Sequence, residues 1–349
     1  MFVRPFLLPA LFFLCVVLVS CKKNGTAAPA PDPVVSPVAD TPIYKGADVS
    51  WLTQMEASGY KFYNAAGAAT DCMQLLKSLG IGVIRLRVWV NPEGGWNNTA
   101  DVIAKAVRAR QLGLRVLIDF HYSDTWADPG HQAKPASWAA YDLPTLVSTV
   151  GSYTKSVLDS LKAAGVVPSW VQVGNETNDG MLWPEGKAST NMANFAALVS
   201  AGYKAVKTVS DTIKVIVHIS NGYDNSLFRW MFDGLQANNA QWDIIGMSLY
   251  PSATNWSSYN ASCLANMNDM VSRYHKPVMV VEVGMPVDQA SVCQSFITDI
   301  IHKVRAVSGG NGLGVFYWEP ECYNNWQGYG LGAFDNTGKP TVAMNAFSH

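Results

Sequence analysis

The feature that most constrains the fold is an alternation of short apolar runs with longer amphipathic stretches, which starts at residue 43 and continues to the end of the chain. This alternation predicts repeated βα units, in which each strand is followed by a helix that covers it. We expect eight strands, at residues 44–49, 83–90, 114–122, 170–174, 213–220, 244–250, 277–283 and 313–318. We expect helices between them, at residues 71–79, 100–112, 143–164, 192–209, 226–235, 264–274 and 292–307, and a short helix at 341–347.

The connections on the two sides of the predicted strands differ in length. Gly80, Gly113 and Gly165 follow predicted helices and lead at once into strands, as glycines that end helices do in tight αβ connections. After the strands, by contrast, the chain runs through long polar loops at 123–142, 177–190 and 251–263. Eight such units favour an α/β fold with a single (β/α)8 TIM barrel, whose functional residues lie at the carboxyl ends of the strands. A doubly wound open sheet is the alternative, but no glycine-rich nucleotide motif follows the first strand.

Composition narrows the class of ligand. The chain is 49% hydrophobic and only 15% charged, so it has ample material for a large core. Its formal net charge is -1 and no run of basic residues extends beyond Lys22 and Lys23, which excludes the electrostatic footprint of a nucleic-acid-binding protein. Its 12 Trp and 14 Tyr suit stacking against a neutral sugar, although any single Trp is more often a core residue.

The N-terminus predicts export. Residues 1–20 combine Arg4 with an apolar run that is too short for a membrane span, as in a signal peptide. The run ends at Leu18-Val19-Ser20-Cys21, a pattern that resembles the lipobox of bacterial lipoproteins, in which the cysteine is lipidated and becomes the mature N-terminus. An ordinary signal peptide cleaved nearby is the alternative. We expect an outer-membrane lipoprotein of the bacterial cell envelope, with a flexible Pro/Ala-rich linker after Cys21 over 22–42 and a catalytic domain over 43–349.

Four cysteines remain in the predicted domain: Cys72, Cys263, Cys293 and Cys322. They form no C-x-x-C pair and no histidine lies at zinc-finger spacing, so we expect no zinc site. Export allows one or two disulfides in three full pairings, and buried free thiols are the alternative.

Two glutamates at predicted strand ends are the strongest catalytic candidates. Glu176 follows the fourth strand and Glu282 lies near the end of the seventh, both within apolar runs where a carboxylate is costly unless it is paired or functional. The fourth and seventh strands lie across a barrel from each other, so the two carboxyls can face one sugar, about 5 Å apart in a retaining glycosidase. For either residue alone a structural salt bridge is the alternative. Spacing does not exclude the other strand-end acids: Asp48, Asp119, Asp124 and Glu319.

An Asn-Glu pair after strand four, with a second Glu at strand seven, resembles the retaining glycoside hydrolases of clan A. More narrowly, the chain resembles glycoside hydrolase family 53, the endo-β-1,4-galactanases, over nearly its whole length from residue 43. The segments that carry this resemblance are Gly-Ala-Asp-Val-Ser at 46–50, Ile-Arg-Leu-Arg-Val-Trp at 84–89, Asp-Phe-His-Tyr-Ser-Asp-Thr-Trp-Ala-Asp-Pro at 119–129, Gln-Val-Gly-Asn-Glu at 172–176 and Trp-Pro at 183–184. The segment at 119–129 is the most specific of them.

The resemblance implies roles for five residues. Glu176 would be the general acid/base, with a pKa raised by apolar surroundings and by the neighbouring nucleophile. Glu282 would be the nucleophile, and Arg85 and Tyr250 are the candidates for keeping it ionised. Asn175 would bind the sugar 2-hydroxyl, a contact that strengthens in the transition state.

The resemblance also implies further substrate contacts. His121 and Asp124 would bind sugar hydroxyls, although a packed core histidine is the alternative for His121. Trp318 would form the floor beneath the cleaved sugar, and Asp48 would either contact the sugar or hold Arg85 in place. Three tryptophans in loops after strands are candidates to extend the groove, with loop packing as the alternative: Trp126, Trp183 and Trp326.

The loop after strand seven departs from the family pattern. Bacterial members often carry an acidic calcium loop here, whereas residues 284–290 are brief and contain one acid, Asp288. Calcium needs about six or more oxygen ligands, so we expect no metal in this loop. The segment at 282–286 reads Glu-Val-Gly-Met-Pro, where the family more usually has Glu-Thr-Gly-Tyr-Pro, which changes one wall of the cleft.

The sequence therefore predicts a retaining endo-β-1,4-galactanase that cleaves galactan or type I arabinogalactan by double displacement and needs no cofactor. Another clan A endoglycanase, such as a mannanase or xylanase, is the nearest alternative, and a non-catalytic surface glycan-binding lipoprotein is the alternative from another class. The expected partners are the polysaccharide and, through the lipid on Cys21, a membrane, but not nucleic acid. We expect a monomer.

Overall fold

The computed structural model describes residues 1–2 and 43–348. The predicted signal peptide beyond Phe2, the lipidation site Cys21 and the linker over 22–42 lie outside the described residues, and those predictions stay untested. No helix in the described part of the chain is both long and apolar enough to cross a membrane.

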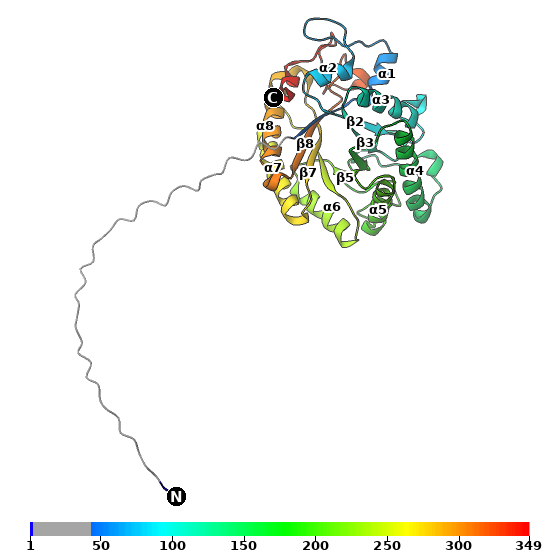
Figure 1. The fold of residues 1–349 in the computed structure, drawn as a ribbon, viewed down its shortest axis with the longest axis vertical. Helices are drawn as coiled ribbons and strands as arrows, with labels where there is room; N and C mark the ends of the chain where they lie inside the picture. Colours follow the sequence, from blue (N-terminus) through cyan, green and yellow to red (C-terminus); the bar gives the residue numbers. More distant parts are fainter. Residues whose placement is uncertain (3–42, 349) are drawn as a thin grey trace, which may run out of the picture. The chain divides into compact units, whose positions relative to one another are not determined.

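Eight parallel strands close into a barrel in chain order, with β1 paired to both β2 and β8 (Figure 1). This confirms the predicted (β/α)8 barrel. The strands are β1 (Tyr44–Asp48), β2 (Val83–Val88), β3 (Arg115–Phe120), β4 (Trp170–Val173), β5 (Lys214–Ile219), β6 (Ile244–Leu249), β7 (Val278–Val283) and β8 (Gly312–Trp318).

The α-helices surround the barrel (Figure 1). They are α1 (Leu52–Ala57), α2 (Cys72–Ser78), α3 (Thr99–Gln111), α4 (Leu143–Ala163), α5 (Met192–Val209), α6 (Asn225–Ala237), α7 (Trp256–Tyr274) and α8 (Ala290–Arg305). Short 3₁₀ turns occupy Glu93–Gly95, Ala136–Trp138, Val287–Gln289, Ser308–Gly310, Trp326–Gly328 and Val342–Phe347.

Local sequence explains where the helices begin and end. Asp71 caps the start of α2 by accepting the backbone N–H of Gln74 at 2.8 Å, and Asp142 caps α4 in the same way. At the other ends, Gly80, Gly113 and Gly165 adopt φ values of 97°, 73° and 79°. Glycine enters this left-handed region without steric cost, so the predicted helix-ending glycines are confirmed.

Large side chains fill the amino-terminal half of the barrel interior. The buried ring of Phe316 from β8 lies against Gly46 of β1, where a Cβ would come within 2.1 Å of it. Trp170 starts β4 and packs edge-on against Tyr44 at 4.6 Å between ring centroids. This end of the barrel is a packed core, so polar side chains gather toward the carboxyl ends of the strands.

The structure corrects two details of the predicted elements and decides between the alternatives left open for the cysteines. Helix α1 was not predicted, because its six residues are too short for a helical period to stand out. Helix α7 begins at Trp256, so residues 256–263 of the expected loop 251–263 are helical. In this first part of the helix, Asn260 donates to the Phe296 carbonyl oxygen at 3.1 Å. The four cysteines are all buried free thiols: Cys72, Cys263, Cys293 and Cys322.

Candidate active site

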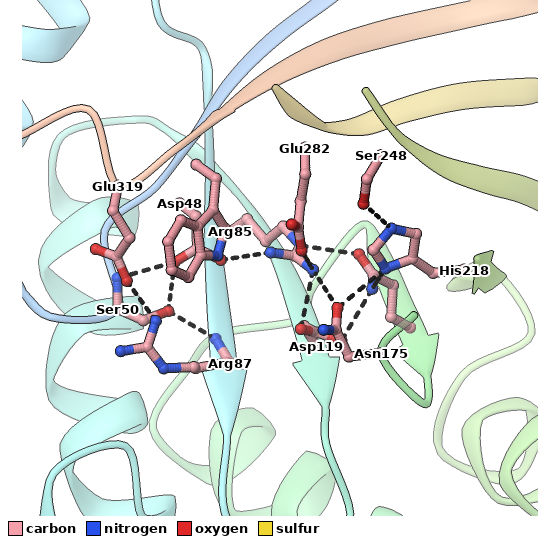
Figure 2. A network of polar contacts seen from close by, with 12 residues as sticks. Asp48, Ser50, Arg85, Arg87, Asp119, Asn175, His218, Ser248, Glu282 and Glu319 are labelled. Atoms are coloured by element: carbon pink, nitrogen blue, oxygen red, sulfur yellow. Dashed lines mark hydrogen bonds and ion pairs between the residues drawn. The ribbon is translucent and has the colours of Figure 1, made fainter. Parts of the chain in front are cut away.

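A buried arginine organises the carboxyl end of the barrel. Arg85 of β2 donates from Nη1 to Asp48 Oδ2 at 2.7 Å and from Nη2 to Asp119 Oδ2 at 2.9 Å (Figure 2). Its Nε donates to Gln172 Oε1 at 2.9 Å. These partners come from β1, β3 and β4, so one guanidinium, none of it exposed, ties four neighbouring strands together. Asp48 is also fully buried, which favours the alternative in which it holds Arg85 in place.

The same guanidinium reaches Glu282 on β7. Arg85 Nη2 lies 2.8 Å from Glu282 Oε1, and the Tyr250 hydroxyl donates to Glu282 Oε2 at 2.9 Å. Both carboxylate oxygens therefore face a donor, as expected for these two residues. Arg85 Nη2 also donates to Asn175 Oδ1 at 2.9 Å, while Asn175 Nδ2 donates to the Ala127 carbonyl oxygen at 2.8 Å.

Glu176 lies three residues beyond β4, with a left-handed φ of 43°. The turn brings its carboxyl near Ser248 of β6, whose side chain lowers the pKa of Glu176. Ser248 is the register partner of Glu282 across the β6–β7 pair. The two glutamates lie close enough for their charges to interact, although 106 positions separate them in the sequence.

Burial perturbs both carboxyls. It raises the pKa of Glu176 to about 7, against the opposing effects of Ser248 and the Arg85 charge. Burial, together with the charge of Glu176, also raises the pKa of Glu282, while Arg85 and the Tyr250 hydrogen bond lower it. Two carboxyls so coupled share one proton near neutral pH. We assign the shared proton to Glu176, because Glu282 faces the Arg85 guanidinium and accepts a hydrogen bond from the Tyr250 hydroxyl.

A second histidine, which the sequence did not single out, completes this network. His218 of β5 is fully buried, with Nε2 2.8 Å from Ser248 Oγ and Nδ1 3.0 Å from Asn175 Oδ1 (Figure 2). Burial and the Arg85 charge hold its pKa well below the usual range, so it is neutral. His218 therefore links Ser248, the register partner of Glu282, to Asn175, which precedes Glu176. Its only sequence signal was a polar residue inside an apolar strand.

The strand-three residues are bound within the protein. His121 Nδ1 accepts from Trp89 Nε1 at 3.1 Å and from the Ala127 N–H at 3.2 Å, which leaves its proton on Nε2, 3.1 Å from Asp119 Oδ2. His121 is 4% exposed, which matches the packed alternative. Asp124 accepts the backbone N–H groups of residues 91 and 136 at 2.8 and 2.9 Å, so it fixes the loop in which Trp126 lies.

A groove of about 420 Å³ opens beside this network and is lined largely by aromatic rings: Trp51, Trp89, Trp96, Trp126, Trp318 and Tyr329. Beneath them the buried Arg87 places its guanidinium 4.9, 5.1 and 4.5 Å from the ring centroids of Trp51, Trp89 and Trp126. Trp318 and Trp126 are among the residues that line this groove, and their contact with a sugar stays a prediction. Trp51, Trp89, Trp96 and Tyr329 were not among the candidates, because nothing in a single sequence marks which ring faces a groove.

Two other predicted groove residues lie elsewhere. Trp326 is 8% exposed and packs edge-on against Tyr60 at 5.0 Å, so it belongs to the core and its expected place along the groove is wrong. Trp183 does not line the groove; its indole donates to the Asp179 carbonyl oxygen at 2.8 Å, and Lys187 lies 5.0 Å from its ring centroid.

The strand-end acid Glu319 is a structural residue. It is fully buried, forms an ion pair with Arg87 and accepts the Trp51 N–H at 3.2 Å. Among the described residues, Glu319, Glu321 and Cys322 each offer one possible metal-ligand atom, and these three atoms lie within 4.8 Å of one another. The set fits a metal poorly, because Glu319 already neutralises Arg87 and burial raises the pKa of the Cys322 thiol well above its usual value.

Comparisons with known proteins agree with this geometry. The model of the family described as glycosyl hydrolase family 53 matches residues 44–295 and 288–347. An arabinogalactan endo-beta-1,4-galactanase of Thermothelomyces thermophilus is 34% identical over 84% of this chain and 94% of its own. A probable arabinogalactan endo-beta-1,4-galactanase A of Neosartorya fischeri is 34% identical over 81% of this chain and 85% of its own.

Solved structures give the same result. A chain from a study of two fungal beta-1,4-galactanases superposes with a TM-score of 0.81 at 32% identity, covering 87% of this chain and 98% of that one. Xylanase 10C of Cellvibrio japonicus reaches a TM-score of 0.63 at 13% identity, covering 89% of this chain and 67% of that one, so it shares the fold alone.

Proposed function

This chain belongs to glycosyl hydrolase family 53, and we propose that it is a retaining endo-β-1,4-galactanase acting on galactan and type I arabinogalactan. The observation that carries the proposal is the pair Glu176 and Glu282, two buried carboxyls at the carboxyl ends of β4 and β7 whose charges interact. In this proposal the Arg85 guanidinium and the Tyr250 phenol stabilise the ionised form of Glu282, and burial favours the protonated form of Glu176. Glycoside hydrolysis by double displacement needs such a pair.

In the first step, Glu282 attacks the anomeric carbon while Glu176 protonates the departing glycosidic oxygen. The products are a covalent galactosyl–enzyme ester and a shortened chain. Forming the ester removes the negative charge of Glu282, which lowers the pKa of Glu176 and lets its carboxylate accept a proton from water in the second step. The water attacks the same carbon, Glu282 leaves, and the anomeric configuration is retained.

Asn175 is placed to bind the sugar being cleaved. Its Oδ1 is held by Arg85, and one hydrogen of Nδ2 is used by the Ala127 carbonyl oxygen. The second Nδ2 hydrogen remains for the 2-hydroxyl, whose hydrogen bond strengthens in the oxocarbenium-like transition state. Trp318 and Trp126, which line the groove, offer flat faces to neighbouring sugars.

The location of the enzyme is a separate proposal. The segment 18–21 supports lipidation of Cys21 and attachment to the bacterial envelope, with the barrel acting as a monomer on extracellular polymer. Mass spectrometry of the mature N-terminal peptide tests this: a diacylglyceryl group on Cys21 supports it, and an unmodified N-terminus at another residue contradicts it. Size-exclusion chromatography with light scattering tests the monomer.

The activity is tested by product analysis with potato galactan and defined galacto-oligosaccharides, following the anomeric protons by NMR. We expect internal cleavage, initial β products and little release of reducing ends from mannan or xylan. Glu176→Gln removes a general acid, which typically contributes about 10²–10⁴ in rate. Glu282→Gln removes the nucleophile and with it the covalent ester. Initial α products, or full activity of Glu282→Gln, would overturn the mechanism.

A further inference from the structure

The amino-terminal mouth of the barrel, opposite the active site, is strongly basic. Here the helices end and the strands begin, and six cations surround the opening: Lys77, Arg110, Arg115, Lys162, Lys214 and Lys276, which we call the basal basic patch. Arg115, Lys214 and Lys276 line a cavity of about 670 Å³ at the centre of this mouth. The cavity is larger than the aromatic groove, yet it lies at the far end of the barrel from Glu176 and Glu282.

These cations are not neutralised by carboxylates among the described residues. Lys77 Nζ donates to the Leu112 carbonyl oxygen at 2.6 Å, and Arg110 Nη1 donates to the Gly165 carbonyl oxygen at 3.0 Å. Each side chain thus reaches the next αβ turn around the rim. A carbonyl oxygen carries no net charge, so the positive charges persist at the surface.

Helix dipoles explain only part of this arrangement. A cation in the last turn of a helix is stabilised by the helix carboxyl end, which accounts for Lys77, Arg110 and Lys162. Arg115 and Lys214 are exposed first residues of strands, and Lys276 lies in a loop. The dipole argument does not apply to these three.

Acidic residues are scarce on the same face. In the αβ connections they are Asp211 and Asp243, and Asp243 is already bound to Lys207 at 2.6 Å. The whole chain has a formal net charge of -1, so this excess is a segregation of charge toward one end of the barrel. Asp243 also lines the cavity, but the cations outnumber the acids, and a face with an excess of one sign of charge attracts a surface of the opposite sign.

Two further observations indicate what that surface is. Val167 is 53% exposed in the α4–β4 connection and lines the mouth beside Pro168, so an apolar side chain projects among the cations. Strand β1 begins at Tyr44, which also lines the mouth. The covalent route from an anchor at Cys21 therefore joins the barrel at this face.

We propose that the basal basic patch docks on the anionic headgroups of the membrane that holds the anchor. The proposal rests on the anchor at Cys21 for its biological setting and is independent of the galactanase activity. Docking turns the carboxyl ends of the strands, with Glu176, Glu282 and the groove, away from the lipid and toward polymer. Each basic residue close to an anionic surface strengthens binding by about fivefold.

The test uses the lipidated chain reconstituted into vesicles of phosphatidylcholine, with or without phosphatidylglycerol. A fluorophore at Val167→Cys reports the mouth and one at Thr125→Cys reports the opposite end, since the four native cysteines in the described domain are buried. We expect a quencher attached to the lipid headgroups to reduce the fluorescence of the Val167→Cys probe in anionic vesicles only. Added salt should reverse this quenching. Equal quenching at both positions, or no dependence on phosphatidylglycerol, would overturn the proposal.

A charge-matched pair of variants isolates the patch. Lys214→Glu with Lys276→Glu should abolish the anionic-specific quenching, whereas Lys61→Glu with Lys155→Glu, exposed residues away from the mouth, should preserve it. An equal loss of quenching in both pairs of variants would indicate that net charge alone drives binding, and this result would refute the proposal. If Cys21 carries no lipid, the mature chain is sedimented with anionic vesicles, and the first pair should lower the partition coefficient about 30-fold or more. Hydrolysis of soluble galactan by the same preparations reports the activity separately.

Discussion

The contact between Tyr250 and Glu282 allows a quantitative prediction of how the activity depends on pH. The phenol donates to the Glu282 carboxylate at 2.9 Å, and this bond can form only while the carboxylate accepts it. A hydrogen bond to a charged group contributes about 1.5–3 kcal/mol. Since one pKa unit corresponds to about 1.36 kcal/mol, Tyr250→Phe should raise the pKa of Glu282 by about one to two units.

The sign of the effect follows from the role of Glu282. A nucleophile works only when ionised, so activity falls on the acid side as Glu282 gains its proton. A higher pKa moves this acid limb of the kcat/KM profile to higher pH by the same one to two units, while the alkaline limb, set by loss of the Glu176 proton, moves little. The assay is kcat/KM on galactan between pH 4 and 9, by release of reducing ends.

A matched variant controls for the loss of a buried hydroxyl. Tyr317→Phe removes a donor to the Leu331 carbonyl oxygen at 2.9 Å on β8, without touching either glutamate in the described contacts. Its pH profile should match that of the unmodified enzyme. If the acid limb of Tyr250→Phe stays in place, or if Tyr317→Phe shifts it equally, the role given to the phenol is refuted.

Two further predictions concern the buried charges. Arg87→Met leaves Glu319 without its cation and should lower the free energy of unfolding by about 3–5 kcal/mol in urea denaturation, whereas Arg87→Met with Glu319→Gln should recover much of this loss; equal instability of the two variants would contradict the ion pair. His218 has a pKa well below its usual range, so as the pH falls below about 6.5 this histidine gains a proton in the unfolded chain but stays neutral in the native state. The free energy of unfolding therefore decreases by up to about 1.4 kcal/mol per pH unit. His218→Gln should remove this component of the decline between pH 6.5 and 5, and an unchanged slope in the variant would argue against a buried neutral histidine.

The barrel could be predicted because its signals are local. A strand such as β7 reads as an apolar run interrupted only by Glu282, and Gly113 ends a helix where the chain turns tightly into a strand. Glu282 was visible for the same reason, as a charge inside such a run. Helix α1 and the true start of α7 were missed, since α1 depends on tertiary packing of Leu52 and Met55 and α7 on polar contacts of Asn260.

The pairing of side chains across strands could not be predicted in this way. Asp48, Asp119 and Glu319 had the same strand-end position as the two catalytic candidates, and spacing alone did not separate them. The structure separates them by their partners, because Arg85 binds the first two and Arg87 binds the third, all fully buried. Trp326 shows a similar limit for aromatic residues, because the sequence does not indicate whether a tryptophan in a loop lines a groove or packs in the core.

The charges around Arg85 suggest how the site favours its transition state. One guanidinium faces three carboxylates, those of Asp48, Asp119 and Glu282, while His218 contributes no charge. The cluster therefore keeps an excess of negative charge in a buried region, where electrostatic interactions are strong. Burial favours the proton on Glu176 before reaction, and the charge of Asp119 acts in the same direction. The negative charge of the cluster also stabilises the positive charge that develops on the sugar as the leaving oxygen departs, so one arrangement of strand-end residues serves both proton donation and charge stabilisation.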